Sequence, residues 1–206
     1  GKLSLYSGCG GIDPATTLPI VLDVGSNNVE RCADPDYLGW RHERIVGPDY
    51  DAFIEAFVQA VMKVFPDVLL QWEDFAEHHA HKLLNRYQDR LCTFNDDIQG
   101  TATVALAAVL SGLRQTDRKL SEQRVVILGG GSAGTGIAEQ IVAAMVAEGL
   151  SQAEARERFY LVDRPGLLVD DMDDLLPFQT PLAQATSAVS DWDLAELGTI
   201  ALPDVI

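Results

Sequence analysis

Two pairs of adjacent acidic residues carry the clearest chemical signal in this sequence of 206 residues. Glu73-Asp74 ends one short apolar run, and Asp96-Asp97 ends another. Both runs predict buried strands, and a carboxylate at the end of such a strand is costly to desolvate without a partner. If the two strand ends face each other, Glu73, Asp74 and Asp97 offer three hard oxygen ligands, the type that Mg²⁺ or Mn²⁺ prefers.

Asp96 has a different expected role, because successive residues of a strand face opposite sides. It would then orient a catalytic base instead of binding the metal. A competing interpretation of both pairs is helix capping, since Asp74 and Asp97 each precede a predicted helix. The recurrence of the same pattern after two similar strands favours the metal site.

A glycine-rich loop is the second chemical signal. The residues 129–134 (GGGSAG) follow the apolar strand 124–128 and open a predicted helix. In a dinucleotide-binding loop, Gly129 permits the tight turn, Gly131 lets the backbone approach the pyrophosphate, and Gly134 allows close packing of the helix. The first N–H groups of the helix, at Ser132 and Ala133, face the phosphates with the positive end of the helix dipole.

Asp163 ends the next predicted strand, where an acid can hold the ribose hydroxyls of a dinucleotide. A carboxylate there repels a 2′-phosphate and so favours NAD over NADP, whereas the neighbouring Arg164 weakens that preference. The competing interpretation is an ordinary turn between a strand and a helix with a capping acid. The strand before the loop and the apolar helix after it favour the dinucleotide site.

These sites belong to a predicted α/β fold. We expect a Rossmann-like, doubly wound parallel sheet preceded by part of a second α/β domain that binds substrate and metal. The predicted division is 1–96 for the catalytic and metal-binding domain and 97–206 for the NAD-binding domain, truncated at its C-terminus. The predicted strands are 18–24, 68–72, 91–95, 124–128 and 159–162, and the predicted helices are 51–65, 77–87, 98–113, 132–148 and a capped helix within 151–158.

Composition excludes several classes of partner. The net charge of −16 argues against a nucleic-acid partner, because nothing would offset repulsion from the phosphates. The three cysteines show no paired spacing, which suits a reducing compartment. No signal peptide and no apolar run of membrane length is found, so we expect a soluble, cytoplasmic protein without a membrane partner.

A cluster of histidines and the lysine near the start of the chain are both expected to be surface residues on their local pattern alone. His78, His79 and His81 could include zinc ligands, but their polar neighbours favour a solvated helix face. Lys2 precedes a strand-like apolar run and, taken alone, is expected to be a surface lysine.

With these residues in place, the chain resembles the malic enzyme family. The similarity spans almost the whole chain in family order and with similar spacing. The matching strings are GKLSLY (1–6), LPIVLDVGSNN (18–28), YLGWRH (37–42), QWEDF (71–75), FNDDIQGTA (94–102), LGGGSAGTGIAEQI (128–141) and VDRPGLL (162–168). The run LLPFQTPLAQ (175–184) is similar to the bacterial NAD-preferring branch.

The resemblance implies oxidative decarboxylation of L-malate to pyruvate and CO₂ with reduction of NAD, dependent on Mg²⁺ or Mn²⁺. It also implies a homodimer or homotetramer. By this likeness Lys2 is the general base and Asp96 the aspartate that assists it, which replaces the surface interpretation of Lys2. The metal ligands implied are Glu73, Asp74 and Asp97, and the NAD-binding positions are Gly129, Gly131, Gly134 and Asp163.

The chain also departs from the family pattern. The family's tyrosine general acid and substrate-binding arginine lie upstream of Gly1, and asparagines near the substrate lie beyond Ile206. We therefore expect the isolated chain to be inactive or nearly so. The alternatives are malolactic enzyme, which yields lactate, a fragment that binds NAD or metal without catalysis, and a dehydrogenase for another 2-hydroxy acid. The acidic set argues against the last, because plain hydride transfer needs no metal.

Overall fold

The computed structural model describes residues 1–192 and 199–206, without the side chains of Glu77 and His78. Its contacts divide the chain into two compact units, Gly1–Pro66 and Asp67–Ile206. The domain junction expected at Asp96-Asp97 stays a prediction.

The first unit is dominated by one long helix. Its helices are α1 (Lys2–Gly8), η1 (Pro14–Thr16), α2 (Val29–Ala33) and α3 (Gly47–Val64). Helix α3 has a proline in its first turn, where no intrahelical N–H is needed, and it ends two residues before Pro66. Its buried face consists of Tyr50, Ile54, Val58 and Val61. The helix predicted over 51–65 is thus present and begins four residues earlier, and Phe53 within it and Phe65 directly after it are exposed.

One predicted strand and one strand-like run of the first unit are not strands in the structure. Residues 18–24 form no strand, and the run 3–6 lies inside helix α1. A strand needs a neighbour with which to exchange backbone hydrogen bonds, and none of the strands in the described residues lies in this unit. Leu18 and Val21 are accordingly 64% and 90% exposed. Apolar content alone therefore did not decide the structure of this segment.

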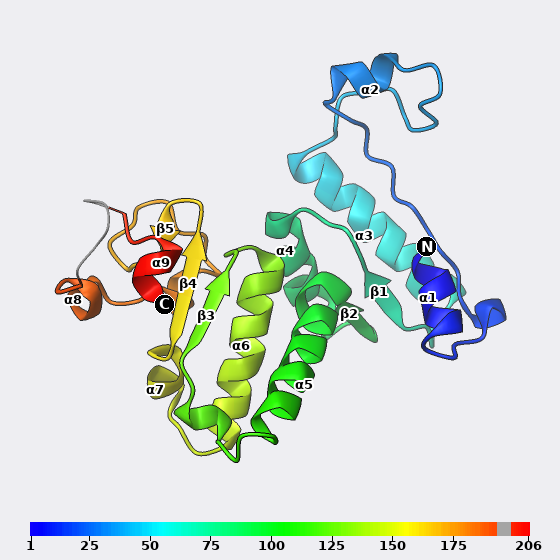
Figure 1. The fold of residues 1–206 in the computed structure, drawn as a ribbon. Coiled ribbons are helices and arrows are strands. Elements are labelled where there is room, and N and C mark those ends of the chain that lie inside the picture. Colours follow the sequence, from blue (N-terminus) through cyan, green and yellow to red (C-terminus); the bar gives the residue numbers. More distant parts are fainter. Residues whose placement is uncertain (193–198) are drawn as a thin grey trace. The chain divides into compact units, whose positions relative to one another are not determined.

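The second unit alternates strands with helices (Figure 1). Its strands are β1 (Leu70–Trp72), β2 (Thr93–Asn95), β3 (Val125–Leu128), β4 (Phe159–Asp163) and β5 (Gly166–Leu167). Its helices are α4 (Glu77–Tyr87), the π-helix η2 (Asp96–Gly100), α5 (Thr101–Leu113), η3 (Leu120–Glu122), α6 (Ser132–Ala147), α7 (Gln152–Arg156), η4 (Thr180–Leu182), α8 (Thr186–Val189) and α9 (Leu202–Val205). The predicted helix over 98–113 is thus two elements, a π-helical turn followed by α5.

The strands form two small sheets. Strand β1 pairs with β2 in parallel, and β3 pairs with β4 in parallel, as predicted for an α/β fold. Strand β5 was not predicted, and it runs antiparallel to β4. It follows β4 after a two-residue connection, too short for a crossover, so an antiparallel return is the available geometry.

Helix α6 lies at the centre of the larger core. It packs against α5 and β3 (Figure 1), and its buried residues Ala138, Ile141 and Met145 join a cluster that includes Phe159 and Leu161 of β4. Local signals fix its limits: Gly149, with φ of +111°, follows its C-terminus, and a capping box of Ser151 and Glu154 starts α7.

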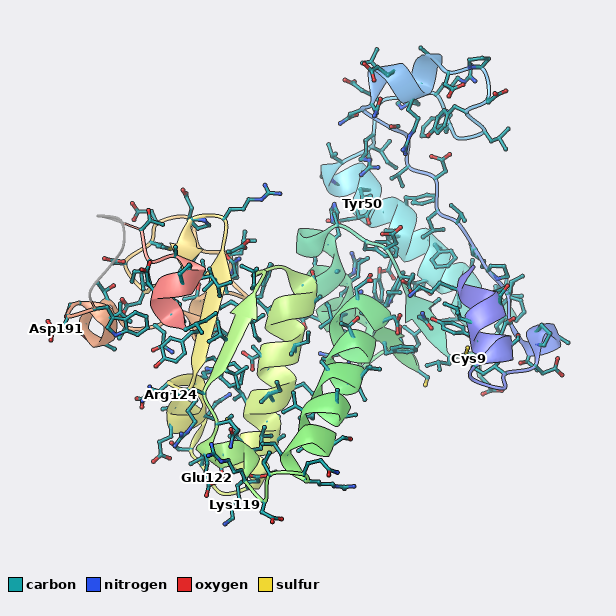
Figure 2. All side chains as sticks on the ribbon, in the orientation of Figure 1. Cys9, Tyr50, Lys119, Glu122, Arg124 and Asp191 are labelled. Atoms are coloured by element: carbon teal, nitrogen blue, oxygen red, sulfur yellow. The ribbon has the colours of Figure 1, made fainter. Side chains whose placement is uncertain are left out.

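A short turn leads into the strand that carries the glycine loop. Figure 2 labels Lys119 and Glu122 at this turn, η3, and Arg124 directly before β3. The backbone N–H of Lys119 donates to the Glu122 carboxylate at 3.3 Å, which closes the turn before β3 begins. Nowhere in the described residues is a helix long and apolar enough to span a membrane.

Candidate functional site

The two acidic pairs lie side by side because their strands are neighbours. In the parallel pair β1–β2, Trp72 is opposite Asn95, so both strands end at the same edge. Glu73-Asp74 and Asp96-Asp97 follow directly. The backbone N–H of Asp74 donates to Oδ2 of Asp97 at 2.8 Å. Residues separated by more than twenty positions are therefore joined at one edge.

Asp74 has an unusual backbone conformation at this edge. Its φ is +64°, in the left-handed region that residues with a side chain seldom adopt, although Asp tolerates it better than most. This conformation accompanies the hydrogen bond from the Asp74 N–H to Asp97. Such outliers concentrate at functional sites, where surrounding contacts maintain them.

Capping does not explain the acidic pairs. The N-cap of α4 is Ala76 and that of α5 is Gly100, neither with a side-chain cap hydrogen bond. The π-helix η2 is capped by Asn95, whose Oδ1 accepts from the Ile98 N–H at 3.0 Å. Neither Asp74 nor Asp97 has the role that the competing interpretation gave it.

The structure joins Asp74 to Asp97 but does not gather three carboxylates. Oε2 of Glu73 accepts a hydrogen bond from Nε2 of Gln71 at 2.9 Å. Among the described side chains, no three acidic, histidine or cysteine groups are arranged to hold a metal ion. The donor set nevertheless suits a hard divalent cation, since it is made of carboxylate oxygens at one strand edge. The hydrogen bond from Gln71 leaves the second oxygen of the Glu73 carboxylate available to a cation.

Asp96 has a different neighbour from Asp97, although both residues lie in the π-helix η2 and not in a strand, so strand alternation is not the reason. A Cβ built at Gly100 would overlap Oδ1 of Asp96, so this carboxylate folds back over the π-helical turn. Lys2, its proposed partner, is an exposed residue of α1 in the first unit. The pairing of Lys2 with Asp96 stays a prediction.

The glycine loop has the backbone that a dinucleotide site requires. Gly129 has φ of +114°, and a Cβ at Gly134 would overlap the Gly129 carbonyl oxygen. Gly131 is the N-cap of α6. The hydroxyl of Ser132 is buried and has no hydrogen-bond partner within the described part of the chain. An unsatisfied donor beside free helical N–H groups fits a phosphate.

Asp163 lies directly against this loop. A Cβ at Gly130 would lie 2.8 Å from Oδ2 of Asp163, so only glycine fits there without displacing the carboxylate. Oδ1 of Asp163 accepts from the Arg164 backbone N–H at 2.9 Å. The Asp163 carboxylate therefore lies next to the glycine loop.

Gln179 is a residue of this site that the sequence did not single out. It is 7% exposed, and its Nε2 donates to the Gly130 carbonyl at 2.8 Å and lies 3.5 Å from Oδ2 of Asp163. Its Oε1 accepts from the Leu176 N–H at 3.0 Å. It lies within 175–184, so its place in the sequence was noticed but its contact with a loop 49 positions away was not.

The histidines on α4 do not all lie on the solvent-exposed helix face that the sequence predicts. The ring of His81 stacks on Phe178 with centroids 4.4 Å apart, and His79 is half-buried. His78 lies outside the described side chains. His81 and Phe178 border a cavity of about 470 Å³ between α4, η2 and α6.

Comparison with known proteins identifies the family. The family model "Malic enzyme, NAD binding domain" matches residues 98–206, and "Malic enzyme, N-terminal domain" matches residues 1–88. The chain belongs to the malic enzyme family.

Malic enzymes from bacteria are similar along the full chain. NAD-dependent malic enzyme 2 of Photobacterium profundum is 56% identical over 206 residues, which cover 100% of this chain and 37% of that protein. NAD-dependent malic enzyme of Vibrio parahaemolyticus is 58% identical over 193 residues, 94% of this chain and 34% of that protein. The chain therefore spans about a third of the length of these relatives.

Solved malic enzymes share the fold. The crystal structure of Entamoeba histolytica malic enzyme matches with a TM-score of 0.61 and 27% identity, covering 88% of this chain and 31% of that one. The α/β class with a Rossmann-like NAD-binding domain is therefore confirmed.

Proposed function

We propose that this malic enzyme chain supplies the metal-binding edge and the NAD-binding face for conversion of L-malate to pyruvate and CO₂ with reduction of NAD. One structural relationship carries the proposal. The acidic turn after β2 and the glycine loop before α6 belong to the same compact unit, and α6 packs on η2. An acidic edge beside a dinucleotide loop suits metal-assisted oxidation of a small hydroxy acid.

NAD is proposed to bind along the glycine loop. The α6 N–H groups and the buried Ser132 hydroxyl would donate to its pyrophosphate, and Asp163 would accept from its ribose hydroxyls. When bound, NAD supplies the acceptor for the hydride that leaves C2 of malate. The residues proposed to contact it are Gly129, Gly131, Ser132, Ala133, Gly134, Asp163 and Arg164.

Glu73, Asp74 and Asp97 are proposed to hold Mg²⁺ or Mn²⁺ at the edge of β1 and β2. When bound, the ion supplies a Lewis acid that polarises a substrate carbonyl oxygen. The hydrogen bond from the Asp74 N–H supports this assignment, because it keeps the Asp97 carboxylate at the edge where Asp74 emerges.

Lys2 is proposed to take the proton of the C2 hydroxyl, and Asp96 is proposed to orient it. A lysine accepts a proton only when its amine is neutral, so an acidic partner must position the group without holding it permanently as an ammonium. The half-buried place of Asp96 over Gly100 supports a fixed orientation for its carboxylate.

The complete gene product that carries this chain provides the test. With malate, NAD and Mn²⁺, we expect equal amounts of pyruvate and NADH, lost on chelation and restored by Mn²⁺. Lactate without net NADH would identify malolactic chemistry instead. Binding of NAD and Mn²⁺ in calorimetry, without any product, would overturn the proposed catalysis and leave a binding module. The isolated 206-residue chain is expected to bind both and form no pyruvate.

We also propose a cytoplasmic location and assembly into a homodimer or homotetramer. The location is supported by the three cysteines, all of which are free thiols. Fractionation of cells and light scattering of the purified gene product test the two proposals separately.

A further inference from the structure

Helix α6 touches the acidic turn through a glycine. A Cβ built at Gly136 would lie 2.6 Å from the carbonyl oxygen of Ile98, 3.1 Å from its Cγ2 and 3.2 Å from its carbonyl carbon. Two of these three atoms belong to the backbone and cannot rotate away. Packed interiors have no spare volume for an added methyl, so backbone lies against backbone at this point.

Each side of the contact leads directly to one part of the proposed site. Ile98 follows Asp97, is 6% exposed, and is held by the hydrogen bond from its N–H to Asn95. Gly136 follows Gly134 by two residues and lies at the end of α6 that carries the glycine loop. The contact is therefore a short, rigid connection between the acidic turn and the dinucleotide loop.

We propose that Gly136 is a positioning residue that sets the separation between Asp97 and the glycine loop. The proposal rests on the proposed function, since it assumes that metal and NAD occupy these two places. Absence of a side chain at Gly136 lets η2 approach α6 closely. A methyl would displace η2, and a misplacement of about 1 Å between reacting groups can cost about 100-fold in rate.

Gly112 offers a matched control. It lies near the end of α5, is exposed, and a Cβ there would meet nothing within 4 Å. Alanine has a higher helix propensity than glycine at both positions, so the local effect on the helix favours both substitutions. A loss confined to Gly136→Ala therefore reports the contact with Ile98.

The experiment compares Gly136→Ala and Gly112→Ala in the complete gene product by two measurements. The first is the kcat for malate oxidation with the KM for NAD. The second is the relaxation of NAD protons by bound Mn²⁺ in NMR spectra, which falls with the sixth power of the metal–proton distance and needs no turnover. For Gly136→Ala we expect kcat to fall by about 10- to 100-fold, KM for NAD to change little, and the relaxation effect to weaken. For Gly112→Ala we expect no change.

The outcomes separate the positioning role from simple destabilisation. Partial unfolding would lower the amount of active protein but would leave the relaxation of NAD in the folded fraction unchanged. If Gly136→Ala does not fold, Asn95→Ala releases the hydrogen bond that holds the Ile98 backbone in this contact, and it should also lower kcat and alter the relaxation. Wild-type values in the folded variant would overturn the positioning role. If the wild-type protein forms no pyruvate or does not bind Mn²⁺, the proposed function itself is overturned, and not only the positioning role of Gly136.

Discussion

The backbone N–H of Asp74 donates a 2.8 Å hydrogen bond to Oδ2 of Asp97. This bond links the ends of the parallel strands β1 and β2, where each strand is followed by a pair of acidic residues. It also links a residue with a left-handed backbone to one at the start of a π-helix, two features that are common at functional sites.

Gln179→Met should weaken NAD binding and lower stability. The substitution keeps the length of the side chain but leaves the Gly130 carbonyl without its buried donor, at a cost of about 1–3 kcal/mol. We expect a higher KM for NAD and a lower midpoint of urea unfolding. Gln115→Met, on an exposed turn, is the control. Equal values for the two variants would show that Gln179 does not hold the loop.

Asn95→Ala should loosen the π-helical turn. Asn95 is fully buried and caps Ile98, and loss of an Asn cap costs about 1 kcal/mol. We expect a lower unfolding free energy and weaker Mn²⁺ binding, because Asp97 lies within the turn. Asn85→Ala, at an exposed position of α4, should change neither quantity. Wild-type affinity for Mn²⁺ in Asn95→Ala would contradict the idea that the Asn95 cap holds Asp97 in place for metal binding.

Asp23 should make the first unit sensitive to acid. The N–H of Trp40, bonded at 2.6 Å, and that of Gly25, bonded at 3.0 Å, lower the pKa of the Asp23 carboxyl. Because the folded pKa is the lower one, the contribution of Asp23 to stability is present above the unfolded value of about 3.9 and is lost as pH falls through the folded pKa.

Asp23→Asn should therefore unfold more easily than the wild type at neutral pH, and the difference should shrink below about pH 4. Fluorescence of Trp40, which stacks on His42 with centroids 4.1 Å apart, provides a local probe. A difference between the two proteins that stays constant down to the acid transition would contradict this account.

Local sequence signals predicted much of the second unit. The limits of α4 coincide with the prediction, and α6, which the glycine stop at Gly149 follows, differs by one residue. The neighbouring ends of β1 and β2 followed from the rule that parallel strands point the same way. The glycine loop was recognisable because its strand and helix flank it directly.

Long-range contacts were not predictable in the same way. Gln179 reaches Gly130 across 49 positions, and no local pattern encodes that bond. The π-helical turn at 96–100 brings Ile98 against Gly136, a contact that sequence periodicity does not reveal. The run 18–24 has the composition of a strand but no strand to pair with in its own unit. The missing partner, and not its local preference, therefore explains why it forms no strand.

The most direct test of the central claim is a Mn²⁺ titration of Asp97→Asn, followed by electron paramagnetic resonance of the free ion. The asparagine can still accept the hydrogen bond from Asp74 but lacks the carboxylate charge. We predict that affinity for Mn²⁺ falls at least about 10-fold, as loss of groups around a metal site commonly causes, whereas Asp89→Asn, at an exposed position, binds as the wild type does. Wild-type affinity in Asp97→Asn would contradict the proposal that this edge holds the catalytic metal.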